Sequence, residues 1–220
     1  MAKSSAARKL TEIESSPQRR RSAFGGGPPT PPVRPNLPIL NNSRLAVVML
    51  LASELMFFAG LIGAFLVFRL SATVWPPPFQ PRLPLGVTGV NSLILLFSAL
   101  TMHWAVSASR TGLASKLVRQ LFFTLLLGAL FLVIQGYEWT RLIHFGLTTS
   151  SSVYGGLFYA LIGAHGAHVF GGLVWLLIVY WQARHGRFTK TDFVGVQTAR
   201  MYWTFVVALW PVLYGLVYLY

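Results

Sequence analysis

The chain has 220 residues, of which 54% are hydrophobic and only 10% are charged, against about 25% charged in an average soluble domain. This composition excludes an ordinary cytosolic domain, and the lack of cysteine excludes disulfide frameworks, thiolate zinc sites, iron–sulfur clusters and cysteine nucleophiles. The formal net charge of +13 would suit a nucleic-acid-binding protein, so the distribution of that charge has to decide.

The first segment, residues 1–43, differs from the rest of the chain. It contains seven basic residues and two glutamates, followed by a glycine- and proline-rich stretch at 25–32. Such a segment cannot bury enough apolar surface to offset its chain entropy. We predict a solvated basic tail on the cytoplasmic side. Binding to anionic lipid and docking to an unknown partner through the prolines remain alternatives.

Five long apolar runs follow, and they define a domain over residues 44–220. Each run is near or above the ~17–20 residues that cross a bilayer as a helix, and strict alternation of a β-barrel strand is absent. We therefore predict an all-α, polytopic membrane bundle. The five expected transmembrane helices cover about 45–68, 85–106, 119–140, 152–181 and 201–220.

The basic residues predict the orientation of these helices. The tail and the second and fourth loops, which lie on one side of the membrane, carry 15 Lys and Arg residues. The first and third loops, on the other side, carry 3. Because basic loops stay in the cytoplasm, we expect a cytoplasmic N-terminus and an external C-terminus. The excess charge therefore marks membrane topology, and no nucleic-acid partner is predicted.

Two glutamates lie in or near the predicted helices. Glu54 is ten residues past Arg44, which places it about 15 Å deep, where a charge costs at least ~2.5–3.5 kcal/mol. We expect Glu54 to face the protein interior, either in a functional role or as a neutral group that stabilises helix packing. Glu138 is expected to form an interfacial ion pair with Arg141 at i+3.

Two histidines, His165 and His168, share one face of the fourth helix, and His103 lies on the second. Their surroundings lack the Glu-x-x-His pattern of a di-iron bundle and the His-Glu-x-x-His motif of zinc proteases, so we predict no metal site. The fourth helix also carries small residues at steps of four, which let neighbouring helices approach closely. We therefore interpret both histidines as interhelical hydrogen-bonding groups.

At these residues the chain resembles subunit III of the haem–copper oxidases, over about residues 44–220 and all five helices in order. The matching motifs are Ser53-Glu54-Leu55-Met56-Phe57-Phe58, Trp75-Pro76-Pro77, Asn91-Ser92, Leu127-Gly128 with Gln135 and Glu138, Gly163-x-His165-Gly166-x-His168-Val169, and Tyr202-Trp203-x-Phe205-Val206 with Trp210. The resemblance is to the five-helix form of the family.

The resemblance implies a non-redox accessory subunit of a proton-pumping terminal oxidase in the bacterial cytoplasmic membrane. It implies no catalytic centre, haem or copper on this chain. Haem and copper belong to the partners, the catalytic subunit I and the electron-accepting subunit II. The implied roles are stabilising subunit I, maintaining proton uptake, holding phospholipids in a cleft and shaping an oxygen route. Glu54 matches the family's carbodiimide-reactive carboxyl group and is expected to line that cleft. The family-motif residues expected in packing or hydrogen bonding are Asn91, Gln135, Glu138, His165, His168 and Trp203.

The last helix departs from the family pattern. Thr204 and Val207 occupy positions where the family usually has His and Asp, and Gln197 occupies a glutamate position. The alternatives are a subunit of a quinol oxidase, a nitric-oxide-reductase-associated relative, a transporter or channel that uses Glu54, and a structural anchor whose tail recruits a partner.

Overall fold

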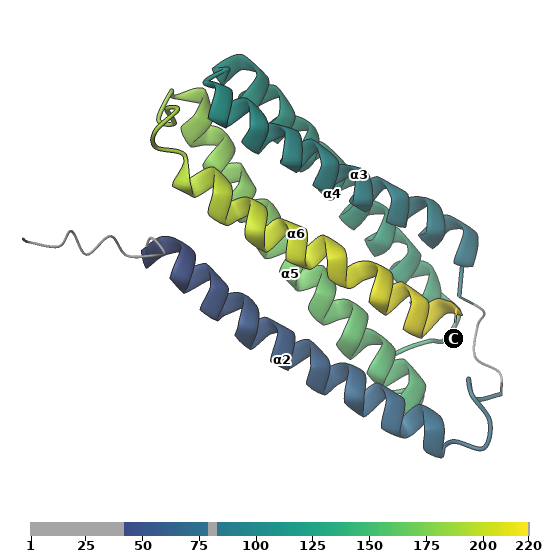
Figure 1. Ribbon diagram of the computed structural model, residues 1–220. Coiled ribbons are helices and arrows are strands. Elements are labelled where there is room, and N and C mark those ends of the chain that lie inside the picture. Colours follow the sequence, from purple (N-terminus) through teal and green to yellow (C-terminus); the bar gives the residue numbers. More distant parts are fainter. Residues whose placement is uncertain (1–41, 79–82, 220) are drawn as a thin grey trace, which may run out of the picture. The chain divides into compact units, whose positions relative to one another are not determined.

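The computed structural model describes residues 42–78 and 83–219 (Figure 1). The described residues contain helices and no strand, and five helices are long and apolar enough to cross a membrane, which confirms the predicted all-helical architecture. They are α2 (Asn42–Ser71), α3 (Leu85–Thr111), α4 (Ala114–His144), α5 (Val153–Arg184) and α6 (Val194–Tyr214), and a π-helical turn, Gly215–Leu219, continues α6. The predicted basic tail falls almost wholly outside the described residues.

The helices extend beyond the apolar runs that predict them. The largest difference is in α6, which begins at Val194 rather than near residue 201. The reason is that hydropathy marks the part of a helix inside the hydrocarbon, whereas hydrogen bonding continues into the polar flanks. The 31 residues of α4 correspond to about 46 Å, against a hydrocarbon thickness of ~30 Å.

Short, well-defined turns connect two of the helix pairs. Gly112 ends α3 with a left-handed backbone (φ 72°), and the N–H groups of Gly112 and Leu113 bond to the carbonyl oxygens of Ser109 and Ala108. This is the glycine-dependent helix end expected before a sharp reversal. At the start of α5, the hydroxyl of Ser152 accepts a hydrogen bond from the N–H of Gly155 at 3.1 Å, which satisfies one of the free donors of the first turn.

The links divide the helix ends into two sets. Figure 1 shows the start of α2, the α3–α4 link and the α5–α6 link at one end of the helices, and the C-terminus at the other. The first end carries most of the described basic residues. They are Arg44, Arg110, Lys116, Arg119, Arg184, Arg187, Lys190 and Arg200, whereas the other end carries Arg69 and Arg141.

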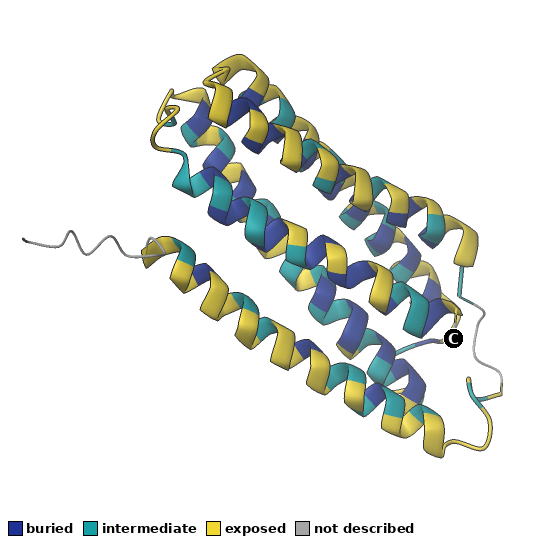
Figure 2. Ribbon diagram, viewed as in Figure 1, coloured by how far each residue is buried: buried dark blue, intermediate teal, exposed yellow. Residues whose placement is uncertain are grey.

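Helix α2 is packed least tightly. It contacts α5 and α6, whereas α3 packs along α4 and α6, and α5 lies between α4 and α6. Three residues of α2 are buried, Val47, Phe58 and Phe65, and the helix is yellow over most of its length in Figure 2. Its orientation on α5 and α6 therefore depends on few contacts.

Two tryptophans of α6 form the centre of the core. Trp203 and Trp210 are fully buried, and their indole N–H groups donate to Ser98 Oγ at 3.1 Å and Ser92 Oγ at 2.7 Å, both on α3. These bonds satisfy polar atoms that no water could reach in a membrane. They join α6 to α3 at two levels.

Two glycines lie close against the ring of Trp203. A Cβ atom added at Gly128 would lie 2.7 Å from Trp203 Cη2, and one at Gly172 would lie 3.0 Å from its Cε3. At the three glycines in the small-residue rows of α5, the nearest neighbours of an added Cβ atom would be 3.3, 3.9 and 4.0 Å away. Gly128 and Gly172 thus leave room for the indole ring of Trp203.

We predict that Gly128→Leu destabilises the chain by about 1–3 kcal/mol, the usual cost of overpacking a close-packed core, because Trp203 and Leu173 already occupy that space. Thermal unfolding in detergent, followed by tryptophan fluorescence, measures the effect. The control is Gly136→Leu on the same helix, where an added Cβ atom would meet no other part of the protein within 4 Å. Equal unfolding midpoints for the two variants would contradict this description of the core.

Candidate functional site

The candidate site is a hydrogen bond between two helices. Glu54 Oε2 on α2 lies 2.7 Å from His168 Nε2 on α5. The side chains are 19% and 20% exposed, so each is largely covered by protein. The structure therefore brings together two residues that the sequence analysis singles out separately.

The geometry fixes the number of protons in this pair. His168 Nδ1 lies 2.6 Å from the carbonyl oxygen of Ala164, and because a carbonyl oxygen can only accept, Nδ1 carries a hydrogen. The Nε2 contact then needs one proton between the two side chains. Either a neutral carboxyl group donates to Nε2, or an imidazolium donates to a carboxylate. The pair has no net charge in either form, which limits the cost of placing it inside a membrane.

Aromatic rings surround the imidazole. The rings of Phe57 and Phe58 lie 5.9 and 5.0 Å from the His168 ring, measured between centroids. From α6, the hydroxyl of Tyr202 donates to the carbonyl oxygen of His168 at 3.3 Å. The polar pair is thus held in an apolar setting, where a hydrogen bond meets little competition from water.

Two further contacts attach α2 near its ends. At the basic end, the guanidinium of Arg44 donates to the side-chain oxygen of Gln197 on α6. Near the other end, the ring of Trp75 packs edge-on between Phe65 of α2 and Tyr154 of α5. Its centroid lies 5.6 Å from the centroid of the Phe65 ring and 5.2 Å from that of the Tyr154 ring. The Glu54–His168 bond lies between these two attachments along α2.

The other predicted site residues lie apart from this pair, in the core of the bundle. Asn91 Nδ2 donates to the carbonyl oxygen of Phe131 at 3.1 Å, which joins α3 to α4. Gln135 Nε2 donates to the hydroxyl of Tyr218 at 3.4 Å. Trp203 bonds to Ser98 as described above. Each of these three side chains therefore donates a hydrogen bond to a different helix or to the turn that follows α6.

Glu138 and His165 have different surroundings. Glu138 is buried and pairs with Arg141 across one helical turn at 3.5 Å, as the i+3 spacing indicates. His165 is also buried and stacks on Trp210 with ring centroids 5.0 Å apart, but neither of its ring nitrogens has a hydrogen-bond partner among the described residues. The interhelical hydrogen bond expected of both histidines is therefore present at His168 only. Within the described ranges, no group of three or more His, Asp or Glu side chains is placed to hold a metal ion.

The three positions that depart from the family pattern also lie in distinct places. Gln197 accepts the Arg44 bond, and Val207 is buried in the core. Thr204 is exposed and lines a hollow of about 610 Å³ together with His103 and Arg200.

The residues of this site stand out in the sequence, but their pairing does not. Nothing in the sequence shows that Glu54 faces His168, or that Arg44 faces Gln197, because the partners are separated by 114 and 153 positions. The one available signal is chemical, since a polar side chain deep in a membrane helix needs a partner and few candidates exist.

Comparison with known proteins identifies the family. Residues 35–220 match the family described as cytochrome c oxidase subunit III. The chain is 40% identical over 174 residues to the cytochrome c oxidase subunit 3 of Synechocystis, covering 79% of this chain and 73% of that protein. It is 37% identical over 180 residues to the probable cytochrome c oxidase subunit 3 of Nocardia farcinica, covering 81% and 88%. The relative from Anopheles gambiae is 35% identical over 193 residues, covering 82% and 70%.

The chain is thus a multi-pass membrane protein of the accessory-subunit class of haem–copper oxidases. It belongs to the cytochrome c oxidase subunit III family, as the motifs in its helices indicate.

We predict a coupling free energy of about 1 kcal/mol between Glu54 and His168, the size typical of hydrogen bonds between membrane helices. It is measured by a double-mutant cycle of Glu54→Leu and His168→Leu, from unfolding in detergent. Ser53→Ala serves as the control in a second cycle with His168→Leu, since Ser53 Oγ bonds within its own helix to Leu50. Additive effects of Glu54→Leu and His168→Leu would contradict the pairing.

Proposed function

We propose that this chain is the non-redox accessory subunit of a proton-pumping terminal oxidase of aerobic electron transport. In this proposal it packs against the catalytic subunit I, which holds haem and copper, with an electron-accepting subunit II in the same complex. The chain itself binds no haem or copper. Its membership of the subunit III family supports the assembly, and the Glu54–His168 pair is the observation that supports a role beyond packing.

The proposed location is a bacterial cytoplasmic membrane, with the N-terminus in the cytoplasm and the C-terminus outside. The charge difference between the two helix ends supports this orientation. Eight described basic residues lie at the end where α2 starts and two lie at the opposite end, and basic segments are retained on the cytoplasmic side.

The proposed role of Glu54 follows from its position on the least buried helix. Neighbouring α2 side chains such as Met56 (76% exposed) and Leu55 (58% exposed) face outward, where lipid chains would surround them. Glu54 therefore stands between the membrane lipid and the bundle, with its proton shared with His168. We infer that the pair holds α2 in position beside a lipid-filled cleft through which oxygen, an apolar molecule, reaches the catalytic subunit. It also supports sustained proton uptake by keeping the subunit interface intact.

The proposal is tested by isolating the oxidase in mild detergent through a tag on this chain. We expect a large oxidase subunit to co-purify and haem bands in the reduced-minus-oxidised spectrum. We also expect the Glu54→Gln complex to assemble, because a glutamine amide can still donate to His168 Nε2, but to inactivate after fewer turnovers.

Ser53→Ala is the matched control, and turnover, proton release and lifetime before inactivation are the measurements. Unchanged turnover and lifetime in the Glu54→Gln complex would remove the dynamic role and leave packing. If native-membrane crosslinking and isolation both fail to find a haem protein, the accessory-subunit proposal fails, and Glu54-dependent transport becomes the hypothesis to test.

A further inference from the structure

One side of α6 is left uncovered between α2 and α3. Helix α6 packs against both of these helices, but α2 and α3 are not packed against each other, and Figure 1 shows α6 lying between them. Toward the basic end of the helices, the surface in this gap is hollowed over about 610 Å³. All three helices contribute to the lining of this three-helix hollow, with Leu51, Ala99, Leu100, His103, Arg200, Met201 and Thr204.

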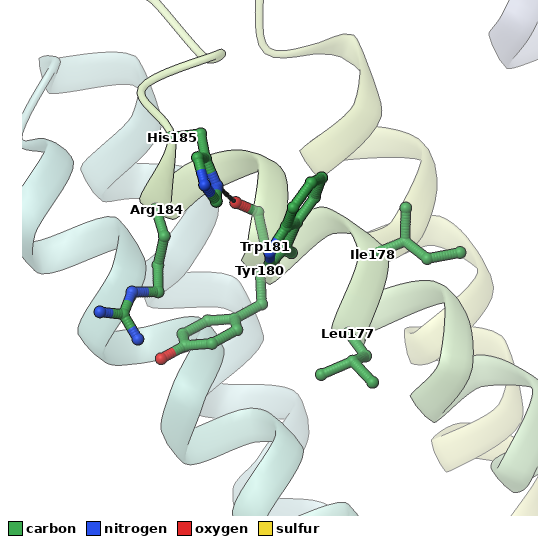
Figure 3. A pocket seen from close by; sticks show the side chains of 6 residues that line it. All are labelled: Leu177, Ile178, Tyr180, Trp181, Arg184 and His185. Atoms are coloured by element: carbon green, nitrogen blue, oxygen red, sulfur yellow. Dashed lines mark hydrogen bonds between the residues drawn. The ribbon is translucent and has the colours of Figure 1, made fainter.

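A hollow of about 750 Å³ at the end of α5 is of a different kind. Figure 3 shows the six side chains that line it, all of which come from α5 and the residue that follows it. A surface formed by one helix has no walls from neighbouring helices. The three-helix hollow has α6 as its floor and α2 and α3 as its sides, so it is the better-formed docking surface.

The three-helix hollow is lined by two basic side chains and by no acidic one. Arg200 comes from α6 and His103 from α3, and Thr204 lies about one turn beyond Arg200. Among the described residues, the guanidinium of Arg200 makes no hydrogen bond or ion pair. Its charge is therefore not neutralised by any carboxylate in the described part of the chain.

Both basic residues lie at the edge of the hydrocarbon. Arg200 directly precedes the apolar run 201–220, and His103 is three residues from the end of the run 85–106. An ion pair is stronger there than in water, because the dielectric constant is lower. A guanidinium binds a carboxylate through two parallel hydrogen bonds, and an imidazole N–H can donate to the same group. The charge of the hollow therefore complements an acidic side chain.

The floor of the hollow suits a helix. Thr204 is exposed on α6, and Ala208, about one turn further along, is exposed as well. Small side chains such as these allow the backbone of another membrane helix to approach closely. An acidic side chain on such a helix would reach Arg200 while its apolar neighbours fill the hollow beside Leu51 and Met201.

We propose that the three-helix hollow docks a transmembrane helix of another polypeptide, which places an Asp or Glu side chain between Arg200 and His103. The carboxylate accepts hydrogen bonds from the guanidinium and from the imidazole ring. This inference rests on the proposed function in one respect, that the chain works inside a complex of membrane subunits. It adds the face that a partner covers and the chemistry by which that partner is recognised.

The test uses the intact complex in native membranes. A photoreactive phenylalanine analogue replaces Leu100, which lines the hollow and is 49% exposed. After illumination and isolation through a tag on this chain, mass spectrometry identifies the attached molecule. We expect a peptide from an apolar segment of about twenty residues that carries Asp or Glu within about two helical turns of the attachment point.

Substitutions at Arg200 test the ion pair. Arg200→Gln should lower the yield of the Leu100 crosslink about fivefold, the upper end for a partly exposed ion pair, and Arg200→Lys should retain more of it. Combining Arg200→Glu with an arginine at the identified acidic position should restore the yield. Arg187→Gln, at an exposed residue of the α5–α6 link outside the hollow, is the matched control and should leave the yield unchanged.

A second crosslinking position shows that the effect is local. The same analogue at Ile178, in the α5 hollow of Figure 3, should give a yield that does not change with Arg200→Gln. Capture of lipid alone at Leu100, in a complex that contains haem, would overturn the docking surface. So would a captured helix without an acidic residue, or equal yields in the Arg200→Gln and Arg187→Gln complexes. Isolation of the chain without any haem protein would instead refute the proposed function.

Discussion

The hydrogen bond between Glu54 and His168 is the interaction on which the position of α2 depends most. In lipid, helices gain little from hydrophobic burial against one another, so packing and interhelical hydrogen bonds decide their arrangement. Three residues of α2 are buried, which is little packing for a helix of 30 residues. A carboxyl group that shares a proton with an imidazole supplies a directional contact at mid-helix, and the pair remains neutral as a unit. The same contact thus attaches α2 to α5 without placing a net charge in the membrane.

The remaining four helices are held differently. Trp203 and Trp210 of α6 fill the centre, and each places its indole N–H on a serine of α3. Gly128 and Gly172 make room for the Trp203 ring from two other helices. The hydrogen bonds between α6 and α3 at this centre join neutral groups. The departures from the family pattern at Thr204 and Val207 are therefore compatible with a well-packed last helix, since Thr204 faces outward and Val207 adds an apolar side chain to the core.

The sequence predicted the number and type of the helices because the requirement for about twenty apolar residues is local. It also singled out Glu54 and His168, because a polar group in such a run is costly. It could not predict their pairing, since hydropathy contains no information on which helices are neighbours. The same limit applies to the bond between Arg44 and Gln197. His165 is the opposite case. It lies on the same face of α5 as His168, so the sequence predicts a hydrogen bond for both. Its ring instead stacks on Trp210, which could be known only from the position of α6.

If the Glu54–His168 bond holds α2 against α5, an electron-spin distance measurement between the two helices shows it most directly. The chain contains no cysteine, so spin labels can be attached at introduced cysteines replacing Met56 on α2 and Phe170 on α5, both exposed, in the full chain in lipid nanodiscs. We expect a narrow distance distribution that broadens when Glu54→Leu is added and stays narrow with Ser53→Ala. A distribution that remains narrow without the carboxyl group would contradict it.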